Sequence, residues 1–195
     1  MKIILLILAL GFPTFCFGQI NKSLRNELLE ILKTDQERPI SPSDSDFIQK
    51  WQRQNKIDSL NMIRVATILD SIGFPSKSLV GNKAYIATFL VVQHSTLKYQ
   101  EKYLPIFQKA AEQNELAWSN VAMMIDRVKV NKNEKQIYGT QVHCIKDPIS
   151  GYCTDKAEFD PIEDEINVNI RRNKVGLNTI EDYAKSFGIE YVQKK

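Results

Sequence analysis

The stretch that decides the fold is residues 82–94, NKAYIATFLVVQH, where almost every side chain from Ala84 to Val92 is apolar. A helix that is apolar on nearly all sides is buried on nearly all sides. The stretch is too short to cross a bilayer, which takes about 20 residues. We therefore predict a buried central helix over residues 82–94, with Gln93 and His94 at its end.

Helical segments flank this central stretch on both sides. Their apolar residues recur near the helical period, and Gly73 followed by Pro75 is a typical stop signal. The predicted helices cover residues 23–33, 46–71, 98–114, 115–128, 168–174 and 179–187. Pro105 is expected to kink one of them or to mark a restart. Residues 35–46 contain two prolines and are predicted to form a loop.

The pattern changes after residue 128. Short β-favouring runs there are separated by turn residues, which predicts two or three strands. No internal repeat or low-complexity segment is present. The predicted fold class is mostly α, a single-domain helical bundle with a small β-hairpin near residues 128–155.

Cys144 and Cys153 flank an Asp-Pro turn and are the cysteines that remain once an export signal is removed. An even pair in an exported chain favours a disulfide, here between neighbouring strands of the hairpin. A metal site with His143 lacks further ligands at suitable spacing. A redox pair is disfavoured because the spacing is not Cys-x-x-Cys. A structural disulfide is therefore the preferred interpretation.

The N-terminus has the pattern of an export signal. Lys2 precedes an apolar run over residues 3–10, and Cys16 and Gly18 are small residues at the positions that signal peptidase reads. Residues 1–18 are predicted to be a signal peptide and residues 19–195 the mature domain, periplasmic or secreted. A retained anchor is one alternative, and lipid attachment through Cys16 is another. No second apolar segment is long enough to span a membrane.

The charge balance excludes some partners. The full chain carries 26 basic and 23 acidic side chains, a formal net charge of +3. Loss of Lys2 with the signal lowers it to +2, which is close to neutral. No long basic run or basic patch with interleaved aromatic residues is present, so nucleic acid is not expected as a partner.

Four short polar clusters border the apolar segments: Gln93-His94, Asp126-Arg127, Tyr138-Gly139-Thr140-Gln141 and Arg171-Arg172. Buried polar groups must find hydrogen-bond partners or cost free energy. Each cluster therefore belongs either to a structural network or to a site. We expect His94 to lie in one cluster with Asp126 and the 138–141 segment, because antiparallel packing with short connections brings such helix ends together.

The clusters supply the candidate site residues. Histidine titrates near neutral pH, so His94 is the candidate general base, with Asp126 orienting it. The candidate ligand-binding residues are Gln93, Arg127, Tyr138, Thr140, Gln141, Arg171 and Arg172. The structural alternative is that His94 caps open carbonyls at its helix end and that Asp126 and Arg127 belong to a buried network. No metal-binding motif is present, and no metal or cofactor is expected.

Many of these motifs, in this order, resemble a bacterial family defined by domain of unknown function number 6624. The residues that carry the resemblance are Asp35-Gln36, Asp58-x-x-Asn61-x-x-Arg64, Gly73-Phe74-Pro75, Ser78-Leu79-Val80-Gly81, Val92-Gln93-His94, Asp126-Arg127-Val128, Gln136-x-Tyr138-Gly139-Thr140-Gln141, Pro161-Ile162-Glu163-Asp164, Arg171-Arg172 and Val175-Gly176-Leu177. The resemblance covers about residues 24–190. This chain departs from the family in having Phe74 where tryptophan is usual and in the Cys144–Cys153 insertion. The resemblance implies one shared architecture and no established reaction.

Two function hypotheses follow. The first is a binding or structural module with a polar pocket around His94, which takes an unknown polar or anionic small ligand. The second is a periplasmic hydrolase-like enzyme with His94 as general base. Because no serine or cysteine nucleophile lies in a recognisable motif, that enzyme would have to use water as its nucleophile.

The export interpretation makes a direct prediction. The mature protein should begin at Gln19, because signal peptidase cleaves after small residues such as Gly18. Mass analysis of the N-terminus of protein recovered from the cell envelope decides this. An intact Met1, or a diacylated Cys16, would contradict soluble export.

Overall fold

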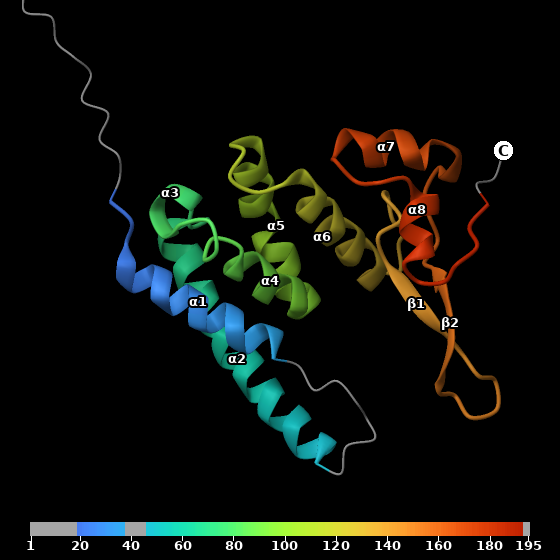
Figure 1. Cartoon of the computed structure of the whole chain (residues 1–195), viewed down its shortest axis with the longest axis horizontal. Helices are drawn as coiled ribbons and strands as arrows, with labels where there is room; N and C mark the ends of the chain where they lie inside the picture. Colours follow the sequence, from blue (N-terminus) through green and yellow to red (C-terminus); the bar gives the residue numbers. More distant parts are fainter. Residues whose placement is uncertain (1–18, 38–45, 193–195) are drawn as a thin grey trace, which may run out of the picture.

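The computed structural model describes residues 19–37 and 46–192 (Figure 1). The predicted signal peptide therefore lies outside the described residues. The elements in chain order are α1 (Lys22–Gln36), α2 (Phe47–Ile72), α3 (Lys77–Val80), α4 (Ala87–His94), α5 (Leu97–Glu112), α6 (Trp118–Asn131), β1 (Val142–Lys146), β2 (Cys153–Phe159), η1 (Glu165–Asn167), α7 (Val168–Lys174) and α8 (Ile180–Lys185). The mostly α fold with one small hairpin is confirmed.

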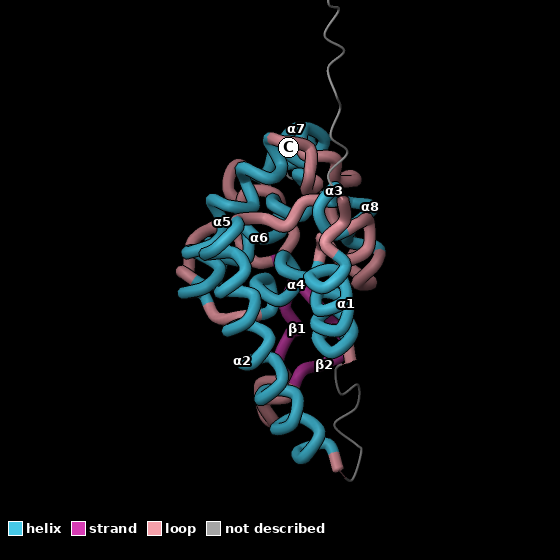
Figure 2. Tube along the Cα trace, turned by 90° about the vertical axis from the view of Figure 1, so that its left-hand side faces the viewer, coloured by secondary structure: helices cyan, strands magenta, loops and turns pink. Residues whose placement is uncertain are grey.

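The core lies around α4, which packs against α1, α2 and α5. It lies between α1 and the α5–α6 pair in both views of the molecule (Figures 1 and 2). Phe89 of α4 meets Phe107 of α5 edge to face at 5.4 Å, and both rings are buried. Such aromatic pairs add about 0.5–1.5 kcal/mol to the burial of their area.

The central helix is shorter than the sequence predicts. Residues 82–86 form turns, and α4 begins only at Ala87. Ala84 is nevertheless fully buried. The apolar run therefore reports burial along its whole length, whereas helix geometry holds for its second half alone.

The other helices lie near their predicted positions, with three differences. Pro105 lies inside α5, which runs unbroken from Leu97 to Glu112. The last helix of this group, α6, continues to Asn131, past its predicted end at residue 128. The short α3 was not predicted. Its N-cap is Ser76, whose hydroxyl accepts a hydrogen bond from the backbone N–H of Leu79.

The C-terminal part consists of the hairpin with α7 and α8 beside it, at the opposite end of the molecule from α1 and α2 (Figure 1). The two strands are antiparallel, with Val142 opposite Phe159 and Cys144 opposite Ala157. The predicted strand region begins too early. Residues 136–141 precede β1 as an irregular loop whose only ladder contact in the described chain is an isolated bridge from Gln136 to Ile162.

The predicted disulfide is confirmed. Cys144 in β1 and Cys153 at the start of β2 are bonded, with their Cα atoms 5.4 Å apart. The bond joins the two strands next to the turn. It also uses both cysteines, so the metal alternative with His143 is not realised; His143 instead contacts Glu158 and Asp160 at 3.1 Å each.

The disulfide should stabilise the chain by a measurable amount. Closing a loop of this length restricts the unfolded chain by about 2.5–3 kcal/mol in the chain-entropy model. Replacing both cysteines, Cys144→Ala with Cys153→Ala, should lower the unfolding free energy by up to that amount and leave the helical circular dichroism unchanged. Urea denaturation measures it. Equal stability of the two proteins in oxidising buffer would contradict the prediction.

Candidate functional site

Asp126 is fully buried near the C-terminal end of α6 and holds the loop that follows. Its carboxylate accepts hydrogen bonds from the backbone N–H groups of Ile137 at 2.7 Å, Tyr138 at 3.0 Å and Thr140 at 3.0 Å. It also accepts the Thr140 hydroxyl at 2.9 Å. Burial raises the pKa of Asp126, and the backbone N–H groups of Tyr138 and Ile137 oppose that rise. The carboxylate is thus fully occupied within the protein.

Gly139 allows the loop to close around this carboxylate. Its φ of 65° is in the left-handed region, which L side chains rarely adopt. A Cβ atom there would also lie 2.6 Å from Cδ1 of Ile180 in α8. The glycine therefore serves a tight turn against a packed helix, and its close approach is to the protein itself.

Two glutamines brace the same loop. The Gln136 side chain is buried and donates to the carbonyls of Gln141 at 3.0 Å and Asp160 at 2.7 Å, while its oxygen accepts the Gln141 N–H at 2.8 Å. The Gln141 amide donates in turn to the carbonyl of Met123 at 3.3 Å. These bonds fix the loop between α6 and the segment that follows β2.

The two neighbouring arginines of α7 hold the other side of the loop. Arg172 is buried and donates to the carbonyls of Tyr138, Gly139 and Asn178. Its guanidinium lies over the Tyr183 ring, 4.9 Å from the centroid. Arg171 donates to the carbonyls of Ile137, Glu163 and Asp164 and pairs with the Asp164 carboxylate. Both arginines are engaged by the protein itself.

This set of bonds corrects part of the predicted site. Asp126 does not orient His94, because its oxygens are committed to the 137–140 segment. Tyr138, Thr140 and Gln141 join it there, and Arg171 and Arg172 close the same network from α7. We call residues Asp126, Gln136 to Gln141, Arg171 and Arg172 the loop network. Its role in the fold is to join α6 to the C-terminal part.

His94 finds a different carboxylate. Its Nδ1 lies 2.9 Å and 3.1 Å from the two carboxylate oxygens of Asp35, near the end of α1. A carboxylate only accepts, so Nδ1 carries a proton, and in the neutral imidazole the lone pair is then on Nε2. The Asp35 side chain is 3% exposed, whereas that of His94 is 28% exposed. Within the described residues no hydrogen bond involves Nε2, so the basic nitrogen is available at the surface.

Asp35 was not among the predicted site residues, because residues 35–46 contain two prolines and were predicted to form a loop. In the structure α1 continues through Gln36, and the Gln36 amide donates to the Asp35 carboxylate at 2.7 Å. The buried Gln54 of α2 steadies the same helix end by donating to the carbonyl of Thr34 at 2.9 Å. The motif Asp35-Gln36 was the available signal. Nothing in its spacing shows that it meets His94.

Gln93 and Arg127 lie beside this pair. The carbonyl of Gln93 accepts from Arg127 Nη1 at 3.3 Å and from the buried Gln100 amide at 3.1 Å. The side-chain oxygen of Gln93 and the Nε of Arg127 are both buried without a hydrogen-bond partner. Burial lowers the pKa of Arg127. These two side chains are therefore the members of the predicted site that the fold leaves incompletely paired.

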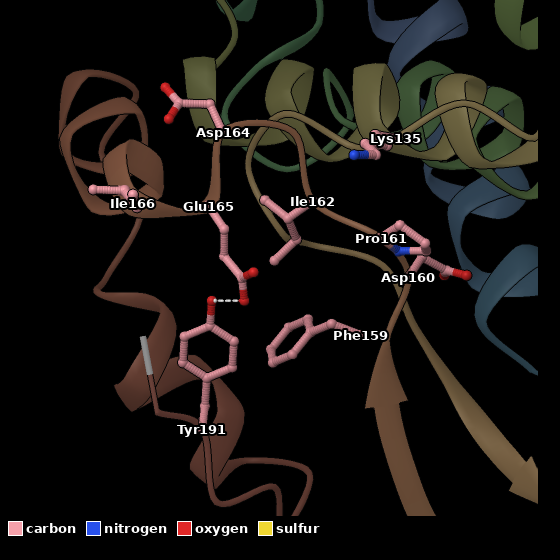
Figure 3. A pocket seen from close by; sticks show the side chains of 9 residues that line it. All are labelled: Lys135, Phe159, Asp160, Pro161, Ile162, Asp164, Glu165, Ile166 and Tyr191. Carbon is pink, nitrogen blue, oxygen red and sulfur yellow. Dashed lines mark hydrogen bonds between the residues drawn. The ribbon is translucent and has the colours of Figure 1, made fainter. Parts of the chain in front are cut away.

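A hollow of about 680 Å³ lies elsewhere, between the end of β2, η1 and the C-terminal segment (Figure 3). Phe159 and Tyr191 both line it, and their rings meet edge to face with centroids 5.5 Å apart. Its carboxylates have partners in the protein: Asp160 contacts His143, Asp164 pairs with Arg171, and Glu165 accepts from Tyr191 at 2.7 Å. Lys135 also lines it without a hydrogen-bond or ion-pair partner among the described residues, and no histidine lines it.

The described residues contain no cluster suited to a metal ion and no helix suited to a membrane. In residues 19–37 and 46–192, no group of three or more histidine, cysteine or acidic side chains is placed to hold a metal ion. Across that same part of the chain, every helix is too short or too polar to cross a membrane.

Comparison with known proteins gives one match. A model of the family of unknown function DUF6624 matches residues 23–194, nearly all of the predicted mature domain. No curated protein and no solved structure matches the chain.

The loop network makes a stability prediction. Asp126→Ala leaves three backbone N–H groups and a hydroxyl without their acceptor, and each unsatisfied buried group costs about 1–3 kcal/mol. The unfolding free energy should fall by more than about 3 kcal/mol, as measured by urea denaturation. Asp155→Ala, which removes an exposed carboxylate from β2, should change it by less than about 0.5 kcal/mol. Equal stability of the two variants would contradict a structural role for Asp126.

Proposed function

The chain belongs to this family of unknown function, DUF6624, and we propose that it is a hydrolase-like enzyme in which His94, oriented by Asp35, activates water as general base. The observation that carries the proposal is the contact of 2.9 Å between His94 Nδ1 and a buried carboxylate. A carboxylate in this position fixes the tautomer and the ring orientation, and it stabilises the imidazolium that forms when Nε2 takes a proton.

The exposure of the two groups supports this assignment. Asp35 is shielded from water, so solvent weakens the attraction between its carboxylate charge and the imidazole only slightly. The His94 side chain is partly exposed, and its Nε2 makes no hydrogen bond in the described residues, which leaves that nitrogen to water and a substrate. Histidine is the side chain most often used as a general base in enzymes. Water is the proposed nucleophile because no serine or cysteine contacts His94 Nε2 in the described residues.

A binding module that uses the same pair without a reaction is the second candidate. The unpaired side-chain oxygen of Gln93 favours it, since a ligand satisfies such a buried acceptor whether or not chemistry follows. The two candidates differ in turnover, which one experiment measures.

We also propose that the protein works outside the cytoplasm, as a periplasmic or secreted protein. The apolar run after Lys2 supports export, and so does the Cys144–Cys153 disulfide, because disulfides persist in oxidising compartments. Lipid attachment through Cys16 is the alternative that N-terminal mass analysis separates.

The catalytic proposal is tested with the two histidines of the chain as a matched pair. Purified protein is assayed against a panel of ester, phosphoester and amide substrates. His94→Gln removes the base and should lower kcat by about 10²- to 10⁴-fold while the unfolding temperature stays within a few degrees. Asp35→Asn should also lower kcat, because a neutral amide stabilises the imidazolium less.

His143→Gln is the control. His143 lies on the exposed hairpin and pairs with Glu158 and Asp160, so its loss should leave kcat unchanged. Undiminished turnover in His94→Gln would overturn the assignment. Absence of turnover by the wild-type protein across the whole panel would favour the binding module over the enzyme.

A further inference from the structure

The Arg127 guanidinium contacts the backbone carbonyl of Gln93, the residue before the proposed base, and the protein leaves most of its donors unused. Arg127 offers five N–H donors, and the described residues accept one bond from them, at 3.3 Å from the Gln93 carbonyl. Its Nε is buried without an acceptor. Nη2 takes no hydrogen bond in the described residues and is not among the buried unpaired atoms, so it meets solvent.

No carboxylate of the described residues neutralises this cation. The adjacent Asp126 is fully used by the loop network, and neighbouring residues on a helix do not face each other. Arg171 and Arg172 differ from Arg127 because each donates hydrogen bonds to several backbone carbonyls. Of the three arginines in the predicted site, Arg127 makes the fewest hydrogen bonds among the described residues, and it is the one with a buried unpaired nitrogen.

Gln93 provides a second and independent sign of a ligand. The residue is 6% exposed, and its side-chain oxygen is buried without a donor. An orphaned acceptor of this kind costs about 1–3 kcal/mol unless something pairs with it. It belongs to the residue that Arg127 contacts and that directly precedes His94. Arg127 therefore has unused donors and contacts the backbone of the residue whose side-chain acceptor is also unused.

We propose that this site takes a small oxyanion that also carries an O–H group, of which hydrogen phosphate is the simplest example. The oxyanion accepts from the Arg127 guanidinium, which presents parallel N–H groups that match phosphate oxygens. Its O–H donates to the Gln93 side-chain oxygen once that amide turns toward the ligand. The proposal rests on the proposed function in naming the substrate class of the same site, an oxyanion that bears an O–H group, such as the monoprotonated form of a phosphate monoester.

A purely structural role for Arg127 makes a different prediction. A cation at the end of α4 interacts favourably with the helix dipole and caps an open carbonyl. If that were its whole role, substitution would lower stability and the protein would show no preference among anions. Anion binding is therefore the property that separates the two roles.

The test is calorimetric titration of the full mature chain with inorganic phosphate and with sulfate, in chloride buffer at constant ionic strength. Sulfate has nearly the same shape and, near neutral pH, lacks the O–H group. The wild-type protein should bind phosphate at least fivefold more tightly than sulfate. Arg127→Gln should weaken phosphate binding at least tenfold, and Arg127→Lys should weaken it less because the charge is kept. Gln93→Leu should abolish the preference for phosphate.

Arg25→Gln is the control, because it removes an exposed positive charge from α1 and should leave both affinities unchanged. If Arg127→Gln fails to fold, the phosphate affinity of Arg127→Lys and the anion preference of Gln93→Leu test the proposal instead. No phosphate binding by the wild-type protein, or unchanged binding in the Arg127 variants, would overturn the proposal.

His94→Gln separates this proposal from the catalytic one. It should bind phosphate within about threefold of wild type, because the anion is held by Arg127, while its turnover is lost. Turnover without phosphate binding would leave His94 as the base and remove Arg127 from the site. Phosphate binding without turnover would leave the oxyanion site and remove the reaction.

Discussion

The hydrogen bonds to the buried Asp126 carboxylate are the interaction on which the arrangement of the two parts of the chain depends. They join the helical part of the chain to the hairpin, α7 and α8. The carboxylate gathers the N–H groups of the loop after α6, and Arg172 gathers carbonyls of the same loop from the other side. Because its polar groups are paired in this way, the loop is held in one backbone conformation. The hairpin, α7 and α8 are therefore held to the helical part by hydrogen bonds as well as by packing.

The same accounting of polar groups separates structure from function in this protein. Apart from the Tyr138 hydroxyl, the polar side chains of the loop network have partners among the described residues, which explains their burial without invoking a ligand. Around His94 the balance differs: Asp35 is paired with the imidazole, but His94 Nε2 is open and atoms of Gln93 and Arg127 have no partner. Buried polar groups that a fold leaves unpaired cost stability. In a binding site a ligand can pair with such groups, which explains why a protein keeps them.

The sequence predicted much of the fold because helical periodicity and stop signals are local. The disulfide followed equally from an isolated cysteine pair around a turn. The length of α4 was wrong because an apolar run reports burial and not backbone geometry, as the buried turn residue Ala84 shows. In the site, His94 and its neighbours Gln93 and Arg127 were identified from polar clusters at helix ends. The partner of His94 was not, since Asp35 is 59 positions away and only packing of α1 against α4 brings the two together.

The most direct test of the central claim is the protonation of the His94 ring, measured by ¹⁵N nuclear magnetic resonance of the imidazole at a pH where it is neutral. A ring held by Asp35 should carry its proton on Nδ1 and leave Nε2 unprotonated, whereas an unconstrained histidine side chain in water favours the opposite tautomer. Asp35→Asn should shift the ring toward the Nε2-protonated form. A wild-type His94 with its proton on Nε2, unchanged by Asp35→Asn, would contradict the account.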